Sequence, residues 1–228
     1  MSKNAFQCLN VKLLLAASTL LWLGTAAALP SGGWRWYEKK PPEPPHWSLE
    51  LKYGNFKPEL EEFKTFYGSD TTKHAAVGVA YKVLRTVEVG VEYGRMRNVG
   101  VGELPLNGTT GGNVTLTVNP MHAYVVLRGI WGEDQIGVPY IGGGVTRVSY
   151  KQSIENQPSR SGTADGNHWR YGLQFLLDRA DPSLASEMRN DYGTSHTYLY
   201  IEKQHYEAKV DDIELGGDTT FIGLLFEF

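Results

Sequence analysis

The amino-acid sequence predicts an all-β protein, an eight-stranded antiparallel transmembrane β-barrel with one short periplasmic helix between strands six and seven. Eight segments alternate apolar residues with polar or small ones. In the C-terminal stretch Phe221–Phe228, the alternate residues from Ile222 to Phe228 form a wholly apolar face. No segment after Leu29 approaches the roughly 18 consecutive apolar residues of a membrane-spanning helix.

Residues 1–28 have the pattern of a secretory signal peptide. Lys3 and Lys12 flank the start of an apolar run, and Ala26 and Ala28 occupy the positions of an A-x-A cleavage site. The only cysteine, Cys8, lies in this segment, so we expect no thiol chemistry in the exported chain. Without the two lysines, 20 basic residues face 25 acidic ones, a net charge of about -5, which argues against nucleic acid as a partner.

The next segment, residues 29–46, is rich in proline and includes Lys39 and Lys40. Proline removes backbone donors that a sheet needs, so we expect an extended lead-in on the periplasmic side. A peptide-like docking arm is the alternative. Residues 47–228 then form the barrel domain.

The predicted strands share a period-two alternation. They are 47–54, 76–83, 87–94, 114–128, 138–150, 169–178, 194–203 and 221–228. Arg85 and Thr86 form a tight turn between the second and third strands. Pro120 indicates a bulge or a local sheet edge in the fourth.

Between the sixth and seventh strands the sequence predicts a helix. Asp181 is the expected N-cap, Pro182 lies in the first turn, and Leu184, Met188 and Tyr192 form an apolar stripe before Gly193. The longer connections, 55–72, 98–113, 151–167 and 204–218, are expected together at the opposite end, with 100–112 as a flexible loop.

The nonapolar strand faces decide between a membrane barrel and a soluble one. They carry nine charged residues of nearly balanced sign, which could pair inside a narrow lumen. These residues are Glu50, Lys52, Lys82, Glu88, Glu92, Arg128, Arg170, Glu202 and Glu227. The opposite faces carry aromatic residues near the strand ends, as expected for two membrane girdles: Tyr53, Tyr93 and Trp169 at one end, Phe226 and Phe228 at the other.

Four sequence pieces resemble the small Gram-negative outer-membrane barrels of the OmpW and OmpX type, and an uncharacterised outer-membrane β-barrel family still more. These pieces are LELKYGNFKP at 49–58, PYIGGG at 139–144, HTYLY at 196–200 and GLLFEF at 223–228. The resemblance implies an outer-membrane β-barrel with no established activity. We expect a monomer. The resemblance also implies that Gly223, Phe226 and Phe228 belong to the signal read by the barrel-insertion machinery, although Phe221 replaces the usual polar residue.

Candidate functional residues lie toward the outer end. Lys73, Arg95, Arg147 and Lys203 share the outward parity of their strands, and we expect them to bind lipopolysaccharide phosphates. Simple solvation of these cations is the alternative. In the first long connection, Phe56, Phe63, Phe66 and Tyr67 are candidates for ligand contact; a loop folded over the barrel mouth is the alternative.

Catalytic and metal chemistry find little support. Ser69, Asp70 and His74 are close in sequence, a weak signal for a lipid-modifying enzyme, since a triad requires a defined geometry. The six histidines lack metal-binding spacing, and we expect no metal or cofactor. Two hypotheses lead: a structural or surface-interaction barrel with a filled lumen, and an OmpW-like site or conduit for small apolar molecules.

Overall fold

The computed structural model describes residues 44–59, 69–103, 110–132, 135–154, 158–210, 213–214 and 216–228. The predicted signal segment, nearly all of the lead-in, and Phe63, Phe66 and Tyr67 lie outside these ranges. The described strands are β1 (Trp47–Pro58), β2 (Thr72–Leu84), β3 (Val87–Glu103), β4 (Thr110–Arg128), β5 (Gly137–Ile154), β6 (Arg160–Leu176), β7 (His196–Val210), β8 (Ile213–Glu214) and β9 (Gly217–Glu227).

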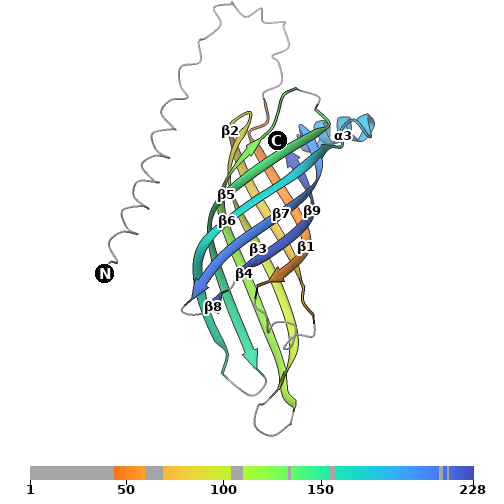
Figure 1. The fold of residues 1–228 in the computed structure, drawn as a ribbon. Helices are drawn as coiled ribbons and strands as arrows, with labels where there is room; N and C mark the ends of the chain where they lie inside the picture. Colours follow the sequence, from red (N-terminus) through yellow and green to blue (C-terminus); the bar gives the residue numbers. More distant parts are fainter. Residues whose placement is uncertain are drawn as a thin grey trace, which may run out of the picture. The chain divides into compact units, whose positions relative to one another are not determined.

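These strands form a closed antiparallel barrel (Figure 1). Each long strand pairs with its neighbour in sequence, β1 pairs with β9, and the pairing of β6 with β7 completes the circle. The two-residue β8 extends only the β7 edge. The barrel wall therefore consists of eight long strands, which confirms the predicted fold class. No helix in the described part of the chain is long and apolar enough to cross a membrane.

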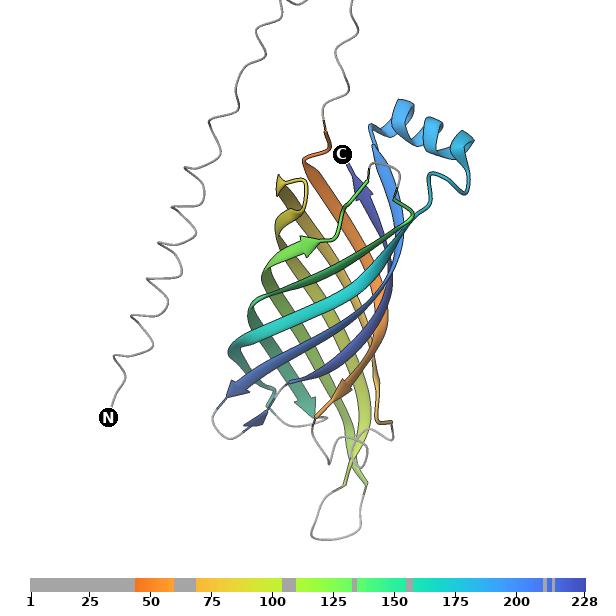
Figure 2. The same cartoon turned by 45° about the horizontal axis from the view of Figure 1, so that its top comes forward.

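The two ends of the barrel differ. At the turn end lie the Arg85–Thr86 turn, the 129–136 connection, the helix, and both His46 and Phe228, whose backbones hydrogen-bond each other. The other end, here called the loop end, is where β1, β3, β5 and β7 finish and β2, β4, β6 and β9 begin (Figure 2).

The predicted facing of the strands is confirmed. Val91 is 55% exposed on the outer wall, whereas its neighbour Glu92 is 2% exposed inside. The same alternation holds in β4, where Met121 and Leu127 point outward and His122 and Arg128 inward. Alternation of apolar and polar residues thus places the apolar set on the outer wall.

Strand lengths at the loop end were predicted too short. Most of 98–113 belongs to β3 and β4, and β1, β5, β6 and β7 also extend into the predicted connections. Apolar alternation ends where the outer wall becomes polar, but backbone pairing continues beyond that point. Of the two alternatives at Pro120, the local sheet edge is confirmed and the bulge is wrong. Pro120 pairs with Val148 of β5 but has no partner in β3, and the register of β3 and β4 shifts at Val101–Gly102 instead.

Helix α3 (Pro182–Tyr192) forms as predicted. The Leu184 backbone N–H donates to the Asp181 carboxylate at 3.0 Å, and Gly193 ends the helix with a left-handed φ of 70°.

Inward aromatic rings lie directly against glycines of the neighbouring strand. The cross-strand pairs are Gly54–Phe221, Gly90–Tyr124, Gly162–Tyr150, Gly172–Tyr140 and Gly223–Tyr200. A Cβ atom added to any of these glycines would approach the partner ring to between 2.6 and 2.8 Å. The space left by the inward glycines is therefore occupied by rings.

Candidate functional site

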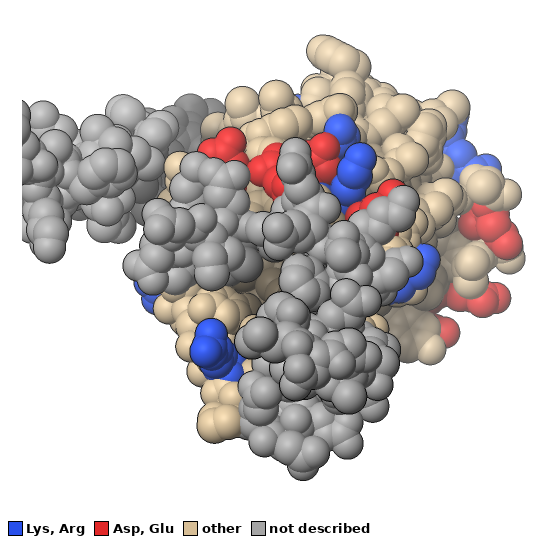
Figure 3. All heavy atoms as spheres, turned by 60° about the horizontal axis from the view of Figure 1, so that its bottom comes forward, with Lys and Arg blue, Asp and Glu red and all other residues tan. Residues whose placement is uncertain are grey.

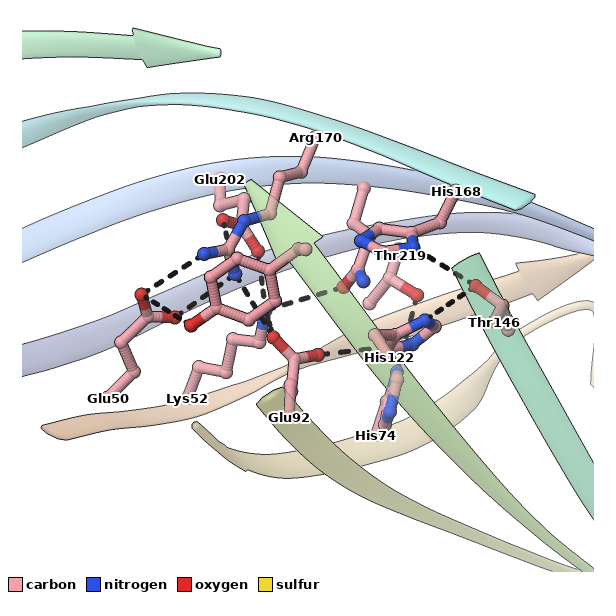
Figure 4. A network of polar contacts seen from close by, with 12 residues as sticks. Glu50, Lys52, His74, Glu92, His122, Thr146, His168, Arg170, Glu202 and Thr219 are labelled. Carbon is pink, nitrogen blue, oxygen red and sulfur yellow. Dashed lines mark hydrogen bonds and ion pairs between the residues drawn. The ribbon is translucent and has the colours of Figure 1, made fainter. Parts of the chain in front are cut away.

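The middle of the barrel lumen contains five charged side chains from four strands, here called the central cluster: Glu50 and Lys52 of β1, Glu92 of β3, Arg170 of β6 and Glu202 of β7 (Figure 4). Lys52 Nζ lies 2.5 Å from Glu92 Oε2 and 2.6 Å from Glu202 Oε1. Arg170 donates from Nη1 and Nη2 to the two Glu50 oxygens at 3.1 and 3.2 Å. None of the five residues is more than 4% exposed.

Tyrosines surround the central cluster. The Tyr140 hydroxyl donates to Glu202 at 2.8 Å, and the Arg170 guanidinium lies 3.7 Å from the centre of the Tyr124 ring. These contacts add hydrogen-bond and cation–π partners to charges that are removed from water.

A second group, the turn-end cluster, comprises Lys82, Glu88, Arg128 and Glu227. Arg128 Nη1 donates to Glu88 at 2.7 Å and also to Glu227 of the last strand, which pairs with Lys82 at 2.5 Å. With this group, all nine inward charged residues predicted from the sequence are buried in ion pairs.

Toward the loop end, three buried histidines from three strands follow the central cluster, here called the histidine layer. His74 Nδ1 lies 3.3 Å from Thr219 Oγ1, and Thr146 Oγ1 lies 2.8 and 3.1 Å from Nδ1 of His122 and His168. The His122 and His168 ring centres are 4.5 Å apart. Within the described residues, no group of three or more His, Cys, Asp or Glu side chains has an arrangement suited to a metal ion.

Sequence reasoning missed the histidine layer. Spacing along the chain showed nothing, because β2, β4 and β6 each contribute one histidine. The inward parity of each position was the available signal, but only the register of the closed barrel shows that they meet.

The serine, aspartate and histidine considered as catalytic residues do not come together. Ser69 Oγ hydrogen-bonds to Thr71 on the exposed connection, and Asp70 is exposed. His74 instead points into the lumen, fully buried, with Phe221 packed 4.8 Å away.

A small apolar cavity of about 40 Å³ lies beyond the histidine layer, lined by Phe56, Pro58, Thr72, Met96, Leu116, Val118 and Tyr206 among others. Phe56 was expected in a loop, but it belongs to β1 and stacks on Tyr206 with ring centres 5.3 Å apart. The buried hydroxyls of Thr72 and Tyr206 have no hydrogen-bond partner among the described residues.

The four predicted rim cations all point outward, and three have partners within the chain. Arg147 makes a bidentate pair with Asp165 at 2.7 and 3.0 Å, Lys203 lies 3.3 Å from Asp218, and Lys73 donates to Asn55 at 2.8 Å. Arg95 is exposed on the same side of β3 as Tyr93. Seen from the loop end, acidic and basic side chains stand side by side on the described surface (Figure 3).

No protein-family model and no curated protein sequence matches the chain. Solved structures do match in fold. Neisserial surface protein A aligns with a TM-score of 0.56 and 12% identity, over 80% of this chain and 97% of that one. The outer membrane protein OprG from Pseudomonas aeruginosa aligns with a TM-score of 0.56 and 9% identity, over 81% and 97%.

The fold is that of the small outer-membrane β-barrels. Identities this low establish the fold and carry no information on ligands or activity.

Proposed function

We propose that this chain is an integral outer-membrane barrel with a structural or surface-interaction role, and that its lumen is closed to solutes by the central cluster. The apolar outer wall, the export pattern of residues 1–28 and the shared fold support the location. The observation that carries closure is a pair of buried ionic contacts across the lumen, Arg170 with Glu50 and Lys52 with Glu92.

The physical argument for closure is the cost of opening. A solute could pass the central cluster only if charged pairs separated in a confined space, and separating a buried pair costs about 3–5 kcal/mol. An interior of eight strands is only just wide enough for its own side chains.

Planar-bilayer recording tests this proposal. We expect no stable steps in the ion current with the parent protein. A variant that replaces Glu50, Tyr124 and Arg170 with alanine should give such steps. Arg147→Ala, on the outer wall, is the matched control and should stay silent. Stable conductance of the folded parent would overturn closure.

A second candidate function is the binding of a small apolar molecule at the apolar cavity beyond the histidine layer, which is lined by Phe56, Met96 and Tyr206 among others. Its aromatic and aliphatic lining, with two unpartnered hydroxyls, suits the alkyl end of an apolar ligand, since a volume of about 40 Å³ does not enclose a whole molecule. The histidine layer and the central cluster lie between the cavity and the turn end, so the structure favours surface binding over passage. Titration of the parent and Met96→Trp with an alkyl phenol tests it; equal heats of binding, or none, would exclude the cavity.

We also propose that the outward cations Lys73, Arg95, Arg147 and Lys203 bind lipopolysaccharide phosphates. Their exposure on the outer wall supports contact with the outer leaflet, and charge-assisted hydrogen bonds suit phosphate. Asp165 and Asp218 compete for two of these cations, so binding requires exchange of partners.

The amount of lipopolysaccharide that stays bound to the folded protein tests whether these four cations bind it. The quadruple alanine variant should retain less than the parent, and Asp165→Asn, which releases Arg147, should retain more. Arg179 and Arg189, at the turn end, provide a matched double-alanine control. Equal retention by the quadruple variant at low and high salt would show that these cations are only solvated.

A further inference from the structure

Helix α3 lies outside the barrel wall. Figures 1 and 2 both show it projecting sideways from the turn end, with its axis running across the strands. None of its residues is fully buried. The helix therefore contributes little to the lumen or to the barrel core, and its placement needs another explanation.

Both stems of the helical segment are fixed to the sheet. The Asp178 carboxylate accepts the Thr197 backbone N–H at 3.0 Å, and its other oxygen lies 2.8 Å from His196 Nδ1. Arg189 Nη2 donates to the Ser195 carbonyl at 3.3 Å. These bonds hold the helix beside the rim and limit its freedom to swing over the barrel opening.

The helix is two-faced. Leu184, Met188 and Tyr192 recur every four residues and lie on one side, with Ala185 beside them. Within this arc Ala185 and Met188 are half-buried, so this part is turned toward the protein, whereas Leu184 is 54% and Tyr192 71% exposed to the surroundings. The opposite side carries Ser183, Ser186 and Asn190, all exposed.

A rim of other apolar side chains is exposed at the turn end, the same end of the barrel as the helix. Trp47, Leu84, Trp131, Ile136 and Phe228 are each 40% exposed or more. On the proposed membrane location, this rim lies where the wall meets the periplasmic headgroups. A helix held across the strands at that height lies parallel to the membrane surface.

We propose that α3 docks its Leu184–Met188–Tyr192 face onto the periplasmic leaflet, among zwitterionic phospholipid headgroups. Exposed charges of both signs near the apolar arc, Arg179 and Arg189 with Glu187 and Asp191, match a headgroup with a phosphate and an ammonium. The docked helix anchors the barrel against tilting and sets its depth. This inference rests on the proposed outer-membrane location.

Single spin labels measure the docking directly. In a Cys8→Ser background the chain has no other cysteine, so Leu184→Cys, Tyr192→Cys, Ser186→Cys and Asn190→Cys each carry one label in the full chain, folded in phosphatidylcholine vesicles. Collisions with a water-soluble nickel chelate should be several-fold less frequent at Leu184 and Tyr192 than at Ser186 and Asn190. Collisions with dissolved oxygen should show the opposite ranking.

A fifth label, at Val91 on the apolar outer wall of the barrel, separates failure of this inference from failure of the proposed membrane location. A label at Val91→Cys should be protected from the chelate and open to oxygen. If Val91 behaves so while all four helix positions meet the chelate equally, the helix does not dock and the inference is overturned. If Val91 also meets the chelate freely, the membrane location itself fails. Heat-modifiable migration on gels confirms that each labelled protein is folded.

Discussion

At the scale of single residues, glycine has a packing role in this barrel. Glycine normally weakens a strand because it offers no side chain to pack. Here Gly90 lets the Tyr124 ring lie on the wall, where Arg170 and Glu50 hold it in place. Small residues on one strand thus allow large rings on the next, which fills the lumen without widening the barrel.

We expect Gly90→Ala to destabilise the folded protein by about 1–3 kcal/mol, the usual cost of overpacking. The new Cβ would lie 2.6 Å from the Tyr124 ring, which Arg170 prevents from moving. Urea unfolding in lipid vesicles measures the effect. Gly137→Ala is the control, because its Cβ would meet only Leu173 at 3.8 Å; equal losses would refute the packing argument.

Residue-scale electrostatics predicts a contrast between two arginines. Arg170→Ala leaves Glu50, Glu92 and Glu202 buried around Lys52 alone, and we expect a loss of about 3–5 kcal/mol of unfolding free energy. Arg147 forms its pair in the open, where both side chains are about two-thirds exposed. Its alanine variant should leave the unfolding free energy nearly unchanged, because solvent screens an exposed ion pair. Similar losses for the two variants in the same unfolding assay would contradict this assignment.

At the scale of elements, the residues of each strand alternate between the lumen and the apolar outer wall. Near the loop end the outer face of the strand becomes polar. In β3, Val91 lies in the apolar belt, while Val99 on the same face lies eight residues nearer the loop end, after Arg95 and Arg97. Outward facing by itself therefore does not define lipid contact; height along the strand matters as well.

These two positions give a depth test within one strand. We expect Val91→Arg to cost about 2–4 kcal/mol and Val99→Arg about 0–1 kcal/mol, because the penalty for a lipid-facing arginine falls toward the interface. Both side chains are similarly exposed, 55% and 57%, so burial does not confound the comparison. The folding free energies of the two variants in lipid vesicles measure the difference. Equal costs would show that the lipid-facing apolar region is not centred near Val91.

At the scale of the whole molecule, the last residue completes the barrel. The Phe228 backbone N–H donates to the Trp47 carbonyl at 2.8 Å, and its carbonyl accepts the N–H of His46 at 2.8 Å. The neighbouring Glu227 reaches across the lumen to Arg128 and Lys82. The end of the chain thus closes the wall against β1 and joins the turn-end cluster.

Deletion of Phe228 should therefore reduce the yield of assembled barrel, because it removes closing backbone bonds and an aromatic side chain of the turn-end girdle. Heat-modifiable migration of protein from membranes reports the folded fraction. Phe228→Trp keeps both features and should assemble as the parent does. An unchanged folded yield after deletion would argue against the terminal strand as an assembly element.

The sequence by itself determined the facing of every long strand and the residues at which the helix begins and ends. Each of these depends on a local period or on a residue preference that acts within a few positions. The alternation around Val91 and the Asp181–Pro182 start needed no knowledge of distant residues. For the same reason the strands were predicted too short, since the local signal ended before the pairing did.

Only the tertiary structure decided which inward side chains meet. Glu50 and Arg170 are 120 residues apart in sequence, and His122 and His168 come from strands that do not pair with each other. Such contacts depend on the radius of the closed barrel and on the stagger between its strands, which parity does not encode. Closing the sheet into a barrel therefore creates the central cluster and the histidine layer, and it places Phe56 inside the barrel mouth.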